Sequence, residues 1–390
     1  MTATDRLPVN TVAVIDLGAL RHNARMLIDR GRGLELTGVV KADAYGHGAV
    51  PVAGILIDAG IRRLAVATVA EGVALRDAGI DRPILVFAPP LDAHGRLYAD
   101  FDLEAVVDSA QTADRLEAAG ASVGCHVEID TGMTRIGVHP ERAVALIRRI
   151  ENSAHLRLAG VMTHLADAET PASTVTERQF GALERILREL GGADGLDAPV
   201  HVANSAALFP DAATAGRLAA AGVSGARTGI GLYGLLRVPD GHPMTRDVAA
   251  LRPVMELRTR VLAVRTVDAG AGVSYGGTWT ASEPRRIATL GAGYADGYPR
   301  LCSNRAVVGL PAHETTAPVV GSVCMDMTMI DLGPPDGALS GVEPGESAVL
   351  FGSATPSCND VAGWAETIAY EITCGVSARV PRRYAEPGGG

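Results

Sequence analysis

The chain has 390 residues, of which 47% are hydrophobic and 20% charged, and its formal net charge at pH 7 is -9. This length and composition predict a globular protein with two domains, or one large barrel with an appendage. The acidic balance, the lack of a Lys/Arg run and an aromatic content of 4% argue against a nucleic-acid partner.

Cysteine usage and hydropathy exclude further classes. The five cysteines are odd in number and scattered, and no two stand at Cys-x-x-Cys spacing, so we predict neither a metal site nor a disulfide framework. The first residues lack the apolar core of a signal peptide, and no stretch is long and apolar enough to span a bilayer. We therefore expect a cytoplasmic protein without a membrane partner.

From about residue 34 to 235, apolar β-branched runs alternate with stretches rich in Ala, Leu, Arg and Glu. This rhythm predicts βα units around a parallel sheet. Strands are expected to end at or near residues 40, 68, 87, 107, 129, 163, 203 and 226, with helices over 68–78, 110–119, 140–150 and 176–190. Eight repeats predict a (β/α)8 TIM-type barrel, whose active site lies at the carboxyl ends of its strands.

The pattern of alternating strands and helices ends after residue 234. Residues 239–243 read as a linker, and short β-type runs follow over 254–264, 286–290, 317–320, 327–332 and 347–351. We therefore predict an α/β fold: an N-terminal (β/α)8 barrel over 11–240 and a C-terminal mostly-β domain over 241–384. Tails are expected at 1–10 and 385–390.

Lys41 is the most informative residue, because it closes an apolar run where an unpartnered ammonium is costly to bury. Desolvation lowers the pKa of such an amine and makes it a nucleophile or base near neutral pH. Tyr45 and the Gly-His-Gly loop 46–48 follow directly. The segment predicts a Schiff-base lysine with a phosphate clamp. The alternative is a lysine that only reaches solvent from a strand end.

Other polar residues gather at the same ends of the expected strands. Glu128, Asp130 and Arg135 surround the end of the fifth strand, His164 ends the sixth, Asn204 and Ser205 follow the seventh, and Arg227 ends the eighth. A chance scatter would not favour one end of so many strands. The clustering predicts an active site at that face of the barrel.

Together these motifs resemble alanine racemases, a family of pyridoxal 5'-phosphate (PLP) enzymes with an N-terminal barrel and a C-terminal β domain. The resemblance runs from about residue 12 to 383 and is most specific over 40–48, Val-Lys-Ala-Asp-Ala-Tyr-Gly-His-Gly. It implies an isomerase that interconverts L- and D-alanine and supplies D-alanine for peptidoglycan. It also implies a homodimer whose active sites are shared between subunits.

The resemblance assigns two catalytic bases. Lys41 carries the cofactor and exchanges the α-proton on one face of the substrate, and Tyr275 of the partner subunit acts on the opposite face. A phenol with a pKa near 10 is a poor base unless its surroundings lower that pKa, and His164 matches the residue that tunes the tyrosine. Arg227 matches the arginine facing the pyridine nitrogen. Because a guanidinium can only donate, it keeps that nitrogen unprotonated.

The remaining assignments concern cofactor and substrate binding. The implied cofactor contacts are Tyr45, Asn204, Ser205, Tyr370 and the backbone N–H groups of Gly229 and Ile230; Arg135 and Met325 match substrate contacts; Glu128, His201, Tyr294 and Asp326 match support and entrance positions. A serine that merely caps a helix would look the same as a phosphate ligand.

Three residues depart from the family pattern. Glu128 stands where many members carry a carbamylated lysine, so we expect an unmodified carboxylate that pairs with Arg135. Thr228 replaces a common proline and Met327 a common glutamine. These two changes are expected to affect the phosphate loop and the entrance rather than the acid/base pair.

The sequence is also compatible in part with other functions. A racemase of another amino acid, such as serine, would share all these motifs. A PLP decarboxylase on the same barrel would not favour Arg227, because a protonated ring is the better electron sink. A non-catalytic PLP carrier has no use for residues 245–383, and a sugar-phosphate barrel enzyme leaves Lys41 and Tyr275 unexplained.

Overall fold

The computed structural model describes residues 9–386 except 32, 92–93, 121 and 355. The tails expected at 1–10 and 385–390 therefore lie outside the described residues, apart from 9–10 and 385–386. The chain divides into two compact units. We call Leu20–Ala44 with Gly48–Arg252 the barrel unit, and Met1–Ala19, Tyr45–His47 and Pro253–Gly390 the β unit.

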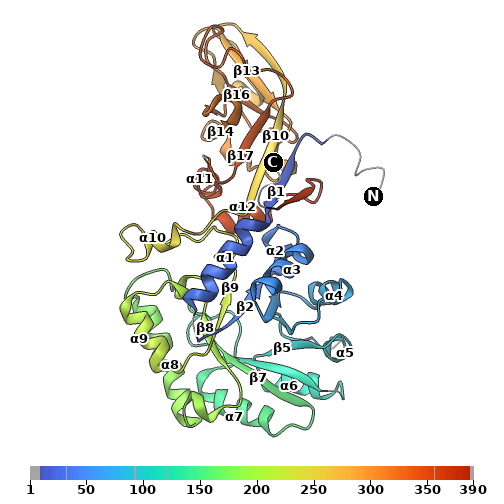
Figure 1. The fold of residues 1–390 in the computed structure, drawn as a ribbon, viewed down its shortest axis with the longest axis vertical. Coiled ribbons are helices and arrows are strands. Elements are labelled where there is room, and N and C mark those ends of the chain that lie inside the picture. The colour runs from blue at the N-terminus through green and yellow to red at the C-terminus, as the bar shows by residue number, and fades with distance from the viewer. Residues whose placement is uncertain (1–8, 32, 92–93, 121, 355, 387–390) are drawn as a thin grey trace. The chain divides into compact units, whose positions relative to one another are not determined.

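The barrel unit is a closed ring of eight parallel strands. In order they are β2 (Glu35–Val39), β3 (Arg63–Val66), β4 (Ile84–Val86), β5 (Leu103–Val107), β6 (Val123–Glu128), β7 (Leu156–Met162), β8 (Val200–Ala203) and β9 (Gly225–Thr228). The ring closes where β9 pairs with β2 (Figure 1). Each strand ends within two residues of the expected position. The predicted (β/α)8 barrel is confirmed.

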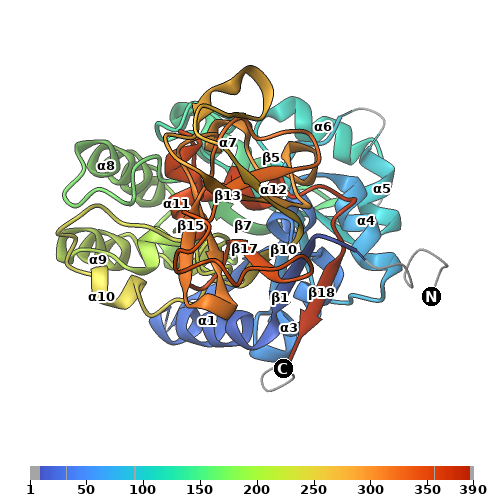
Figure 2. The ribbon, with the colours of Figure 1, turned by 90° about the horizontal axis from the view of Figure 1, so that it is seen from above.

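Helices cover the outside of this ring. They are α1 (Leu17–Arg30), α3 (Ala49–Ala59), α4 (Val69–Asp77), α5 (Gly95–Asp100), α6 (Ala110–Glu117), α7 (Pro140–Glu151), α8 (Thr174–Glu189), α9 (Ala212–Ala220) and the short α10 (Thr245–Val248). Helices α3 to α6 follow one another around the unit (Figure 2). Several begin at a side chain that accepts a backbone N–H, such as Ser109, Ser173 and Asp211. Covered on both faces, the strands read as continuous apolar runs.

The β unit is built on one large sheet. Its path is β15 (Thr315–Pro318), β14 (Val307–Leu310), β17 (Ser347–Phe351), β10 (Met255–Val267), β1 (Val12–Asp16) and β18 (Arg382–Ala385), while β13 (Arg285–Leu290) joins β10 to β16 (Thr328–Asp331). A two-stranded ribbon, β11 (Gly272–Val273) with β12 (Trp279–Thr280), and helices α11 (Cys358–Trp364) and α12 (Ala369–Cys374) complete it. The mostly-β character predicted after residue 241 is confirmed.

Strand β1 differs from the expected division of the chain, which places residues 11–240 in the barrel. It pairs antiparallel with β10 and parallel with β18, so it belongs to the sheet of the β unit. Its alternate residues Ala13 and Ile15 are fully buried. That period of two is typical of a half-buried strand. No helix among the described residues has the length and apolar character needed to cross a membrane.

Candidate active site

Lys41 leaves the end of β2 through a left-handed turn. Residues 42–45 all have φ between 52° and 56°, although none is a glycine. Such a conformation costs ~1–2 kcal/mol per residue, so other contacts must hold it. The Ala42 N–H donates to the Glu71 carboxylate (2.6 Å), and the Asp43 carboxylate accepts from the Ala49 N–H (2.7 Å). These contacts fix the direction in which Lys41 leaves the strand.

Glu71 also caps the neighbouring helix. Its second oxygen accepts the backbone N–H groups of Ala67 (2.8 Å) and Thr68 (3.1 Å), and the Thr68 hydroxyl accepts the Glu71 N–H in a capping box at the start of α4. The half-buried Lys41 ammonium lies 5.8 Å from the centroid of the Phe87 ring, which follows β4. One carboxylate therefore joins the turn after Lys41 to a rigid helix end.

Arg227 on β9 is buried and donates in four directions. One terminal nitrogen bonds to the carbonyl of His201 and lies 3.1 Å from its Nδ1. The other donates to the carbonyl of Thr163 (2.7 Å) and lies 3.2 Å from Nδ1 of His164. Because arginine has no acceptor, both Nδ1 atoms accept. In a neutral ring the proton then stands on Nε2.

Burial decides the charges around Arg227. Burial, followed by the positive charges of Arg227, Arg135 and Lys41, lowers the pKa of His164 to about 3. Burial, then Arg227, also lowers the pKa of His201 well below its usual value. The pKa of Arg227 itself falls to about 10, chiefly through burial, but the guanidinium stays charged at neutral pH. Both imidazoles are therefore neutral acceptors around a single cation.

A backbone turn after β9 closes around Ser205. Its hydroxyl accepts the N–H groups of Gly229 (2.9 Å) and Gly231 (3.2 Å) and lies 3.1 Å from the Thr228 hydroxyl. A Cβ at Gly231 would lie 3.3 Å from the Ser205 β-carbon, so a larger residue would press on this turn. Converging N–H and hydroxyl groups at the end of a barrel strand suit a phosphate dianion. Thr228, one of the departures, contributes a hydroxyl here.

Asn204 faces its own helix turn, since its side-chain oxygen accepts the Ala207 N–H (3.0 Å) at the short helix η3 (Ala206–Leu208). The other groups fit PLP on their chemistry. Lys41 offers an amine, the Ser205 turn offers donors for a phosphate, and Arg227 offers a donor-only cation for an unprotonated ring nitrogen. All three lie in the barrel unit.

Glu128 ends β6 and is buried. Burial raises its pKa, and the opposing effect of the Arg227 and Arg135 charges is smaller. Arg135 is exposed, and within the described part of the chain no hydrogen bond or ion pair joins it to Glu128. The expected interaction of this pair therefore acts through space.

In the β unit, Tyr275, Met325 and Asp326 line one cavity of about 610 Å³ together with Met327. Tyr275 is 74% exposed and begins the short helix η4 (Tyr275–Gly277). Ser274, just before it, has φ 63° and donates its hydroxyl to the carbonyl of Ser322 (2.6 Å). The strained residue thus fixes the start of the segment that carries Tyr275.

Two further contacts organise this unit. Arg379 donates to both oxygens of Asp296 (2.8 and 2.9 Å) and pairs with Asp326 (2.8 Å), which joins the segment carrying Tyr294 to the segment carrying Met325.

The rings of Tyr45 and Tyr370 lie 5.9 Å apart. Burial, then the nearby Tyr370, raises the pKa of Tyr45, so its phenol stays protonated and able to donate.

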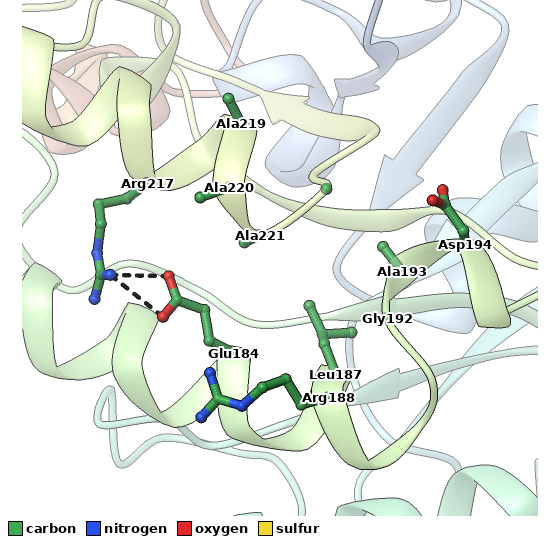
Figure 3. Close-up of a pocket in the computed structure, with 11 residues that line it drawn as sticks. Glu184, Leu187, Arg188, Gly192, Ala193, Asp194, Arg217, Ala219, Ala220 and Ala221 are labelled. Carbon is green, nitrogen blue, oxygen red and sulfur yellow. Dashed lines mark hydrogen bonds and ion pairs between the residues drawn. The ribbon is translucent and has the colours of Figure 1, made fainter.

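A second cavity, of about 590 Å³, lies between α8 and α9 (Figure 3). Its Glu184 and Arg217 form an ion pair (3.0 Å), and Arg188 and Asp194 add one further charge of each sign. These charges balance one another, and its lining residues include no Lys, His, Cys, Ser, Thr or Tyr. It therefore does not compete with the strand-end cluster as an active site.

Several residues near the site were not predicted from the sequence. Glu71 lies in the first turn of a helix and was not predicted, although the Thr-x-x-Glu pattern at 68–71 is a recognisable capping signal. Glu104 and His126 lie inside the fully buried strands β5 and β6. Titratable residues within apolar runs were the signal for this pair, because burying them requires partners.

The closed barrel, the separate β unit and the strand-end cluster define the class of protein: a barrel-type amino-acid racemase. Family models described as "Alanine racemase, N-terminal domain" and "Alanine racemase, C-terminal domain" match residues 15–237 and 254–384. The chain belongs to the alanine racemase family. The resemblance drawn from the motifs is thereby confirmed.

Individual relatives agree with this assignment. The chain is similar to the alanine racemase of Halothermothrix orenii (38% identity, 99% of each chain) and to that of Chlorobaculum tepidum (40%, 95% of this chain and 94% of the relative). Among solved structures it is similar to alanine racemase from D-cycloserine-producing Streptomyces lavendulae, with TM-score 0.86, 33% identity and coverage of 97% and 98%. The Bacillus anthracis enzyme with bound L-Ala-P gives TM-score 0.86, 32% identity and coverage of 98% and 96%.

Proposed function

We propose that this protein interconverts L- and D-alanine with PLP bound in the barrel unit and supplies D-alanine for peptidoglycan. The observation that carries the proposal is the buried Arg227, whose donors are shared between two neutral imidazoles beside the strand-end lysine. Family membership supports the reaction, and the donor set supports the cofactor.

The proposed roles follow from the chemistry of each group. PLP, when bound, disperses the negative charge that forms on the α-carbon of an amino acid. The Lys41 amine takes or returns the α-proton on one face, and the partner subunit's Tyr275 does so on the other. Ser205 and the N–H groups of Gly229 and Ile230 hold the phosphate. Arg227 donates to the ring nitrogen and leaves it unprotonated.

Arg135 and the Met325 backbone bind the substrate carboxylate, and Tyr294 and Asp326 border the entrance. We further propose a cytoplasmic homodimer with shared active sites. Large apolar side chains of the β unit are exposed, among them Tyr275, Met325 and Met327. A second copy covering this face would remove them from water.

Cofactor binding can be assigned to one side chain, because Lys41 is the only lysine in the chain. Borohydride reduction of the PLP-loaded protein fixes an imine as a stable amine. We expect one pyridoxyl group per chain, on the peptide that contains Lys41, and none in Lys41→Ala. An unlabelled wild-type chain after PLP loading would contradict cofactor binding at Lys41.

Activity is tested by following D-alanine formation from L-alanine with PLP, beside a panel that includes L-serine and amino acids with longer side chains. Alanine is expected to give the highest kcat/KM, and Lys41→Ala is expected to be inactive. A higher kcat/KM for serine would reassign the substrate within the same racemase class.

A further inference from the structure

A hydrogen-bonded row of four buried polar side chains crosses the barrel interior. We call this row, Arg227, His201, His126 and Glu104, the file. The Arg227 guanidinium lies 3.1 Å from Nδ1 of His201, whose Nε2 lies 2.8 Å from Nδ1 of His126. Nε2 of His126 lies 3.1 Å from a carboxylate oxygen of Glu104. The four residues come from β9, β8, β6 and β5 and are all buried. None of them is exposed enough for water to replace these contacts.

Only one arrangement of protons satisfies this file. Arginine can only donate, so Nδ1 of His201 accepts and its proton stands on Nε2. That proton points at Nδ1 of His126, which must accept, so the His126 proton stands on Nε2 and faces Glu104. In the reverse direction, His201 would accept at both nitrogens and carry no proton at all. The hydrogen bonds therefore all run one way, from Arg227 to Glu104.

The electrostatics agree with this direction. Burial lowers the pKa of His126, so its ring is neutral at pH 7. Burial raises the pKa of Glu104, but the hydrogen bond from His126 and the charges around it outweigh that effect, and the net pKa is lowered. Arg63 lies 3.3 Å and Arg157 3.8 Å from its oxygens. The file ends on a fixed negative charge.

A glycine makes room for the file. Strand β7 lies between β6 and β8 in the barrel, so the two histidines meet across it at Gly160. A Cβ at this position would lie 2.3 Å from Nδ1 of His126 and 2.7 Å from Nε2 of His201. Any residue other than glycine would push the imidazoles apart. Gly160→Ala therefore offers a way to break the file without removing any of its members.

We propose that Glu104 and His126 are positioning residues for Arg227, acting through His201. Each N–H bond polarises the next in the same direction, so the Glu104 charge makes Nδ1 of His201 a stronger acceptor. The guanidinium is thereby held in one plane beside the place where the ring nitrogen of the cofactor is proposed to lie. The catalytic effect rests on the proposed function, but the proton arrangement does not.

The first experiment reads the protons directly. In protein labelled with ¹⁵N-histidine, with and without PLP, the signals of His126 and His201 are assigned by their loss in His126→Gln and His201→Gln. We expect both rings to be neutral, with a protonated Nε2 and a bare Nδ1. A protonated Nδ1 or an imidazolium at either residue in the wild-type protein would overturn the proposal, whatever the activity of the enzyme.

The second experiment uses Glu104→Gln, which keeps an acceptor for His126 but removes the charge. We expect kcat for alanine racemisation to fall roughly three- to tenfold with KM little changed, which is less than the ~10- to 100-fold typical of groups behind a metal ligand, because Glu104→Gln keeps the hydrogen bond and removes only the charge. The His201 Nε2–H proton signal should also move upfield as its hydrogen bond weakens. Gly160→Ala should produce both changes more strongly.

The matched control is Glu35→Gln, because Glu35 lies 3.5 Å from the same Arg63 but is not part of the file. It should leave kcat and the histidine signals unchanged. Equal effects of Glu35→Gln and Glu104→Gln, or a Glu104→Gln variant with wild-type kcat and signals, would contradict the positioning role. An inactive wild-type protein with the expected proton arrangement would refute the proposed function alone.

Discussion

The chemistry at Arg227 depends on which side chains are kept neutral. His164, His201 and His126 all have lowered pKa values, with burial as the first cause in each case. A neutral imidazole accepts at one nitrogen and donates at the other, whereas an imidazolium beside Arg227 would repel it. Burial of the histidines therefore prevents a second positive charge from forming beside the Arg227 guanidinium.

At the residue scale, we predict that Glu128→Gln raises KM for alanine about two- to fivefold with kcat nearly unchanged. Glu128 acts on Arg135 through space, and attraction of this kind to an exposed charge is worth ~0.5–1 kcal/mol. Loss of the charge is expected to release Arg135 from the position proposed for it beside the substrate carboxylate. Steady-state kinetics test this, with the exposed Glu141→Gln as control, and an unchanged KM would refute it.

At the element scale, the left-handed turn after Lys41 stores conformational strain. We predict that Ala42→Gly stabilises the protein by about 1 kcal/mol, because glycine adopts φ near +52° without the Cβ clash. The matched control is Ala74→Gly in the interior of the right-handed α4, also at an exposed position, which should destabilise by about 0.5–1 kcal/mol.

Urea unfolding midpoints of the two variants and the wild type check this pair. The same substitution is expected to shift the midpoint upward at residue 42 and downward at residue 74. A downward shift at both positions would mean that the turn is not strained in the way its φ values indicate.

The barrel elements were predictable because each strand is a short, buried apolar run, and such runs end where polar residues begin. The left-handed turn was not, since Ala42, Asp43 and Ala44 carry none of the glycine signals of positive φ. Strand β1 was missed because its five residues directly precede a helix and its pairing partners are remote in sequence. Local patterns do not encode such partners.

Some residues of the candidate site could likewise be predicted from the sequence, and others could not. Residues at strand ends, such as Lys41 and Arg227, were predicted because the active site of such a barrel lies at the carboxyl ends of its strands. Glu104 and His126 were not predicted, since they lie inside strands. Their role follows only from the hydrogen bonds that they make to residues of other strands. The direction of their hydrogen bonds depends on distances that no spacing in the sequence reveals.

At the scale of the whole molecule, the proposed sharing of active sites between subunits predicts complementation between two inactive variants. Lys41→Ala and Tyr275→Phe, each inactive alone, are co-expressed or mixed under conditions that exchange subunits. Random pairing makes half of the dimers mixed, and each mixed dimer has one site with both Lys41 and Tyr275. We expect about a quarter of the wild-type activity.

The double variant Lys41→Ala/Tyr275→Phe mixed with wild type serves as control, because its mixed dimers contain no intact site. If both bases came from one chain, the two single variants would recover nothing when combined. Activity that stays at the level of the separate variants would therefore exclude a site shared between subunits.

The pairing of β1 with both β10 and β18 has a consequence for synthesis on the ribosome. Strand β1 is synthesised before the barrel sequence, and both of its neighbours, β10 and β18, are synthesised after it. The whole barrel sequence emerges in between, and domains tend to fold as they emerge. Strand β1 must therefore remain unpaired, with both edges open, until β10 and β18 have been synthesised.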